Sequence, residues 1–191
     1  MTTCYESLTL DQCNSLLSSA EGLKVSRFWR SVEPGVFFEL GRLSRKGTDR
    51  RKERSGQITL MVESDWRVEG PRSIHFGSSF SATIIEKRLA DLVGLHVSSI
   101  TADSETREMR LQFSDGRIFR TFCDWSSQPR WTVLFNDASL LPMDAAWQGV
   151  DVTPCLHISA GRPEIEYCFD EDEVDMPALV ALVATYRSPP N

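Results

Sequence analysis

The sequence predicts an α+β protein: a twisted antiparallel β-sheet built from hairpins and a meander, with a central packing helix and a helix near each end of the chain. Two observations carry this prediction. From Met109 to Phe122, apolar residues alternate with polar ones on both sides of Ser114-Asp115-Gly116, which is the pattern of a β-hairpin. Between Ser81 and Gly94, apolar residues instead recur at the spacing of an amphipathic helix.

The chain of 191 residues fits a single domain that can bury a hydrophobic core. We expect residues 1–55 to hold an N-terminal helix, a hairpin and a basic loop, and residues 56–135 to hold the sheet and its central helix. Residues 136–191 are expected to add strands and a C-terminal helix. No apolar run is long enough to cross a bilayer and no signal peptide is recognisable, so we expect a cytoplasmic protein.

The N-terminal part is expected to contain a short helix and a hairpin. Residues 8–20 have an apolar side, with Thr9 or Asp11 as the cap and Gly22 at the stop. Strands at 24–32 and 36–40 follow, joined by a tight turn. The next segment, 44–56, has no apolar residue and is expected to be a solvated loop.

The central part is expected to alternate between strands and one helix. Strands are predicted at 56–63 and 66–68, with a short extended piece at 73–77. The helix that follows Ser81 has an apolar side made of Ile84, Ile85, Leu89, Leu92 and Val93. Residues 95–100 then return to the sheet, and residues 131–135 are expected to complete a three-strand meander with the hairpin.

The C-terminal part is expected to form two strands and a helix. The strands are predicted at 154–158 and 165–169, on either side of Gly161-Arg162-Pro163. The helix is predicted at 176–186, and it is apolar nearly all round. Such a helix is usually buried, either within the domain or between the subunits of a homodimer.

The residues that usually carry catalysis or bind metals form no recognisable motif in this sequence. The five cysteines are widely scattered and the three histidines, His75, His96 and His157, are far apart, so we expect reduced thiols, no metal and no cofactor. Cys123 with either His96 or His157, and with Asp124 to orient the imidazole, is a conceivable nucleophile, but packing is the favoured interpretation of Cys123. An enzyme with an unrecognised site remains a third hypothesis, and it predicts a deep pocket with convergent titratable groups.

Charge is distributed unevenly along a chain whose net charge is −6. Between Arg42 and Arg54 there are seven Lys and Arg residues and two acids, so the local charge is +5. From Asp144 to Asn191 there are nine acids and two arginines, so the local charge is −7. The basic segment is a candidate nucleic-acid-binding loop, and the acidic one is suited to attracting a basic protein surface.

Four segments resemble small bacterial domains of uncharacterised or immunity type that are encoded beside polymorphic toxins. These segments are Gly56–Trp66, Ile74–Ser78, Leu111–Gly116 and Trp131–Phe135, so the resemblance covers roughly residues 56–135. It implies an antitoxin-like protein that blocks a partner by binding it, without catalysis of its own.

Our principal hypothesis is therefore a non-catalytic protein-binding module, an immunity-like inhibitor of a basic toxin domain. Its candidate partner-binding residues are the acids of the C-terminal part and two tryptophans that can serve as interface anchors, namely Glu164, Glu166, Asp170, Glu171, Asp172, Glu173, Asp175, Trp125 and Trp147. The alternative is a nucleic-acid-binding accessory protein that uses the basic loop, with the candidate residues Arg45, Lys46, Arg50, Arg51, Lys52 and Arg54.

Overall fold

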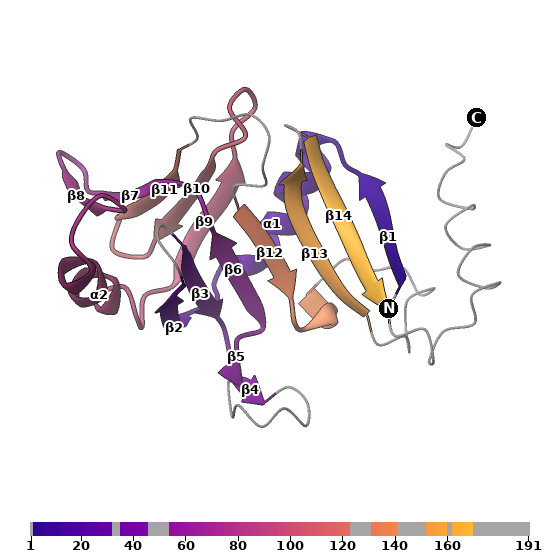
Figure 1. Ribbon diagram of the computed structural model, residues 1–191, viewed down its shortest axis with the longest axis horizontal. Helices are drawn as coiled ribbons and strands as arrows, with labels where there is room; N and C mark the ends of the chain where they lie inside the picture. The colour runs from indigo at the N-terminus through magenta and orange to yellow at the C-terminus, as the bar shows by residue number, and fades with distance from the viewer. Residues whose placement is uncertain are drawn as a thin grey trace.

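A computed structural model describes residues 2–31, 35–45, 54–122, 131–140, 152–159 and 162–169. It confirms the α+β class, with two antiparallel sheets, a two-stranded ladder and two short α-helices in the described residues (Figure 1). The seven-stranded sheet has the order β1 (Thr2–Ser7), β14 (Arg162–Phe169), β13 (Val152–Ser159), β12 (Trp131–Phe135), β6 (Ile58–Val62), β3 (Val36–Leu40) and β2 (Val25–Arg30). The five-stranded sheet has the order β8 (Ile74–Gly77), β7 (Trp66–Glu69), β11 (Ile118–Thr121), β10 (Met109–Phe113) and β9 (Val97–Ala102).

The inner faces of the two sheets share one hydrophobic core. Phe119 of β11 meets Phe38 of β3 edge to face at a centroid distance of 5.1 Å, and it stacks on Trp66 of β7 at 5.2 Å. Beyond this contact, β13, β14 and β1 extend the seven-stranded sheet away from the five-stranded one (Figure 1). The core therefore sits between the five-stranded sheet and the β2–β3–β6–β12 half of the other sheet.

The two sheets are also connected through the backbone. Only Glu63–Asp65 separate β6 from β7, so one extended segment passes from the first sheet into the second. Elsewhere residues 22–25 pair with residues 94–97, since the Val25 N–H donates to Leu95 O at 2.8 Å and the Gly94 N–H donates to Val25 O at 2.8 Å. These links hold the sheets in one orientation around the core.

The first helix, α1 (Leu10–Leu17), continues into a 3₁₀ turn at Ser18–Ala20 and contacts both β9 and β14. Thr9 caps it in a capping box with Gln12, as one of the two expected caps. The side-chain amide of Asn14 makes two hydrogen bonds to the last residue of β9: its Oδ1 accepts from the Ala102 N–H at 2.7 Å, and its Nδ2 donates to the Ala102 carbonyl at 3.4 Å. The predicted helix at 8–20 is thus confirmed.

Cys13 of α1 is a free thiol inside the core, and we expect it to make stability fall in alkali. Burial raises the pKa of this thiol from 9.0 to about 11, against the opposing effect of the Arg107 charge. As the pH rises from 9 toward 11, the unfolded chain releases this proton before the folded protein does. Wild type should therefore lose about 1.4 kcal/mol per pH unit relative to Cys13→Ala in this window.

Urea unfolding of both proteins under reducing conditions, below and within this pH window, measures that difference. The two proteins share every other titrating group, so a constant difference between them would contradict the proposed cause.

The second helix, α2 (Ala82–Ala90), begins after Ser81 as predicted and lies beside β8. Ile85, Leu89 and Leu92 are buried in the core, but Ile84 and Val93 are 45% and 43% exposed. The apolar side expected for this helix is therefore too broad by these two residues, because α2 packs at the end of the core rather than across a sheet. None of the helices among the described residues is long and apolar enough to cross a membrane.

The structure changes the sequence-based account in three places. The three-strand meander is wrong, because β12 pairs with β6 and β13 in the seven-stranded sheet while β10 and β11 form their hairpin in the other sheet. The N-terminal strand β1, which pairs with β14, was not predicted. The expected loop at 44–56 starts and ends in a ladder of β4 (Ser44–Arg45) and β5 (Arg54–Ser55). The expected helix at 176–186 lies outside the described residues.

Candidate functional site

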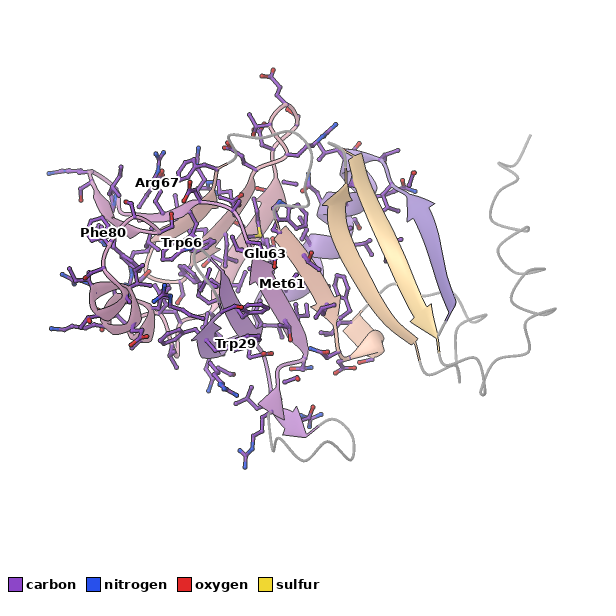
Figure 2. The ribbon with its side chains drawn as sticks, viewed as in Figure 1. Trp29, Met61, Glu63, Trp66, Arg67 and Phe80 are labelled. Carbon is purple, nitrogen blue, oxygen red and sulfur yellow. The ribbon has the colours of Figure 1, made fainter. Side chains whose placement is uncertain are left out.

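Three arginines lie side by side across the five-stranded sheet. The register places Arg120 of β11 directly opposite Arg67 of β7 on one side and Arg110 of β10 on the other. Their strand neighbours, among them Trp66 and Phe119, are buried in the core. Because side chains alternate along a strand, the three arginines lie on the outer face, as Trp66 and Arg67 illustrate (Figure 2). We call Arg67, Arg120 and Arg110 the arginine row.

The two outer members of the arginine row have polar partners on their own strands. Arg67 donates its Nε–H to Glu69, and its guanidinium lies 4.2 Å from the centre of the Phe122 ring. Arg110 donates from Nη2 to Gln112 Oε1 at 3.0 Å. Both partners lie two residues further along the strand, so each arginine reaches a neighbour on the same face.

Arg120, the central member, has an apolar residue in the corresponding place. Because β11 runs antiparallel to β7 and β10, the residue of β11 that lies level with Glu69 and Gln112 is Ile118. The side chain of Ile118 cannot accept a hydrogen bond. The Nε atom of Arg120 is buried and has no hydrogen-bond partner within the described part of the chain. A buried donor without a partner costs about 1–3 kcal/mol, and like charges directly opposite on neighbouring strands add to that cost.

An acidic side chain near the row is engaged elsewhere. Asp103 lies just beyond β9. The pKa of its carboxyl is below the usual value because the carboxylate accepts hydrogen bonds from the Thr106 N–H, the Glu105 N–H and the Thr106 hydroxyl, and the Arg120 charge has a smaller effect in the same direction. The carboxylate thus accepts hydrogen bonds from its own turn. Arg120 is therefore suited to an oxyanion from another molecule, because its side chain as a whole is only half-buried and a guanidinium binds carboxylate or phosphate through paired N–H groups.

The sequence-predicted acidic site is described only in part. Glu164 and Glu166 lie in β14, where they alternate with the buried Pro163 and Ile165. Glu164 is opposite His157 of β13, and Glu166 is opposite Cys155. The other proposed partner-binding residues, Asp170, Glu171, Asp172, Glu173, Asp175, Trp125 and Trp147, lie outside the described residues.

The predicted nucleic-acid-binding loop is likewise described only at its ends. Arg45 of β4 pairs with Arg54 of β5 in the two-stranded ladder. Lys46, Arg50, Arg51 and Lys52 lie outside the described residues, as do Cys123 and Asp124 of the conceivable nucleophile. Within the described segments, no group of three or more His, Cys, Asp or Glu side chains is placed to hold a metal ion.

Sequence reasoning missed the arginine row. Arg110 and Arg120 occupy alternate positions of apolar-polar strands, which indicates an outward orientation. Arg67, however, is 43 positions before Arg110 in the sequence, and only the β7–β11 pairing brings it into line. A comparison of the chain with family models, curated proteins and solved structures finds no match. Fold and site together define an α+β protein with a row of three half-buried arginines on the outer face of its five-stranded sheet.

Proposed function

We propose that the protein is a non-catalytic protein-binding module, and that the arginine row receives an acidic segment of the partner. The observation that carries this proposal is the buried Nε of Arg120, which lacks a partner among the described residues and lies between two other arginines. Because the Arg120 side chain as a whole is only half-buried, a carboxylate of the partner pairs with its accessible edge and offsets the repulsion between the guanidinium groups, and a small shift of the side chain lets the Nε–H donate to it as well. The cost borne by the free protein is thus recovered on binding.

The surroundings of the row favour a protein over a nucleic acid. Ile74 is 58% exposed on β8, and Ile118 lies beside the row on β11. Aliphatic side chains next to arginines are typical of protein interfaces. Arg67 already occupies one face of the Phe122 ring, which leaves less of it for stacking on a base, and the net charge of −6 opposes attraction to a phosphate backbone.

An immunity-like inhibitor of a toxin domain, acting in the cytoplasm, is the narrower form of this proposal. It is supported by the resemblance of residues 56–135 to immunity-type domains. In this form the acids around Glu164 and Glu166 form a second contact, with a basic surface of the same partner. The partner would then present both an acidic segment and a basic surface, and charge variants test the two contacts separately.

Arg120→Met is expected to make the free protein more stable. Methionine keeps much of the length and apolar volume of the side chain, while the unpaired donor and one of three neighbouring charges are removed. The expected gain is about 1–2 kcal/mol in the free energy of unfolding, measured by urea denaturation. Arg88→Met on the exposed side of α2 is the control and should change stability by less than about 0.5 kcal/mol. A loss of stability in Arg120→Met would contradict the account of the site.

The binding test uses the partner that the wild-type protein captures by cross-linking in its own source, once this partner has been identified and purified. Arg120→Met should weaken binding by about 30-fold or more, because a buried charged hydrogen bond is lost, whereas Arg88→Met should leave the dissociation constant unchanged. Glu164→Gln with Glu166→Gln tests the second contact. An unchanged dissociation constant for Arg120→Met, or capture of nucleic acid in place of a protein, would overturn the proposal.

A further inference from the structure

A second cationic site lies where residues 22–25 pair with residues 94–97. Lys24 is directly opposite His96 in an isolated antiparallel bridge, and both residues are exposed. Side chains directly opposite in such a pair start about 4.5–5.5 Å apart. Arg42 lies on the same groove, because the neighbouring Gly41 donates its N–H to the Lys24 carbonyl at 2.7 Å. The groove has a volume of about 690 Å³.

Three glycines line this groove, and two of them, Gly22 and Gly94, leave its walls free of side chains. Gly22, Gly41 and Gly94 all line it, and all three have positive φ values, of 80°, 79° and 97°. A Cβ at Gly22 or Gly94 would meet no atom within 4 Å, so these two positions face open space. Turns of this kind leave the backbone accessible and free of side chains.

The side-chain donors of the groove have few partners within the described parts of the chain. Within the described parts of the chain, Lys24 and His96 form no ion pair. The Asp137 carboxylate accepts hydrogen bonds from the Ser139 hydroxyl at 2.6 Å and from Gln57 Nε2 at 3.0 Å, and these lower its pKa. The Arg42 charge lowers the pKa of Asp137 to a smaller extent, so Asp137 already has partners other than Arg42. Three groups that donate hydrogen bonds, drawn from three separate segments, therefore remain available on one groove.

We infer that this groove binds a phosphate-bearing small molecule of about the size of a mononucleotide. Lys24 and His96 approach from one strand pair and Arg42 from the loop after β3, which suits the tetrahedral oxygens of a phosphate. Leu23, Leu43 and Val93 supply apolar surface for the uncharged part of the ligand. The volume falls within the range of small-molecule sites. This inference is independent of the proposed protein partner, since the groove and the arginine row share no residue.

The test is a titration of the full chain with adenosine 5′-monophosphate near physiological salt, followed by amide chemical shifts in NMR spectra. Shifts are expected to cluster at residues 22–26, 41–43 and 93–96. Lys24→Met and Arg42→Met should each weaken binding about tenfold or more, since each removes a charged hydrogen-bond donor. Lys87→Met, on the exposed side of α2, is the matched control and should bind as wild type does.

Titrations with other ligands show which part of the nucleotide the groove binds. Adenosine should not bind, and inorganic phosphate should bind more weakly than the nucleotide at the same residues. Equal effects of chloride and nucleotide at one ionic strength, or unchanged affinity in Lys24→Met, would overturn the inference. Binding of an oligonucleotide but not the nucleotide, lost on neutralising Arg50, Arg51 and Lys52, would also overturn it and would support the nucleic-acid alternative.

Discussion

Phe119→Ala is expected to destabilise the protein by about 4 kcal/mol, because this ring joins the two sheets. Phe119 is fully buried and contacts Trp66 in its own sheet and Phe38 in the other. Removing the ring leaves a cavity at the only described aromatic contact between β11 and β3, and the stiff sheets can close it only in part. Urea denaturation followed by tryptophan fluorescence measures the loss.

Two further variants make this prediction specific. Phe119→Leu keeps most of the volume and should cost less than about half as much. Phe80→Ala removes a ring that is 42% exposed and should change stability by less than about 0.5 kcal/mol. A loss in Phe119→Ala no larger than that in Phe80→Ala would contradict the packing of the two sheets.

Glu39→Ala is expected to cost about 3–5 kcal/mol, because it leaves several hydrogen-bond donors without an acceptor. Glu39 of β3 is only 4% exposed. Its Oε2 accepts from the Gly56 N–H at 2.7 Å and from the Thr59 hydroxyl at 2.7 Å, and its Oε1 accepts from Trp29 Nε1 at 3.1 Å. The side chain thus ties β2, β3 and the start of β6 together from the outer face of the sheet.

The controls separate loss of hydrogen bonds from loss of volume and charge. Glu39→Gln keeps the shape and one acceptor oxygen, so it should cost about 1–2 kcal/mol. Glu63→Ala removes an exposed carboxylate just after β6 and should change stability by less than about 0.5 kcal/mol. Trp29 stacks on Phe37 at a centroid distance of 3.5 Å and donates its Nε1–H to Glu39. Its fluorescence emission should therefore shift in Glu39→Ala, because this hydrogen bond is lost. Equal stability of Glu39→Ala and Glu63→Ala would show that the network contributes nothing.

The glycine contacts explain why Glu39 can reach its partners. A Cβ at Gly56 would lie 2.5 Å from the Leu40 carbonyl oxygen, so β3 and the start of β6 approach more closely here than another residue allows. This close approach brings the Gly56 N–H within hydrogen-bond distance of the Glu39 carboxylate. From the sequence, Gly56 was expected only to mark the boundary between the basic loop and the strand at 56–63.

Local patterns in the sequence determined most of the individual elements. Helix α1 was predicted from its cap, its stop and its apolar side, helix α2 from its apolar spacing, and the β10–β11 hairpin from Ser114-Asp115-Gly116 between alternating strands. These signals depend on neighbouring residues, whose backbone preferences and side-chain periodicity act over a few positions. The alternation also indicated the buried face of strands such as β10, whereas β3 is buried along its whole length.

Only the tertiary structure decided which strands pair. Residues 131–135 have the composition of a strand, but nothing local distinguishes pairing with β11 from pairing with β6, because both partners present a similar apolar face. The bend between β6 and β7 directs the two ends of one segment into different sheets. The arginine row and the groove between Lys24, Arg42 and His96 both depend on such pairings between distant segments. The sequence alone therefore determined most of the elements, whereas the candidate sites required the sheet order, since long-range pairing is set by the packing of the whole core.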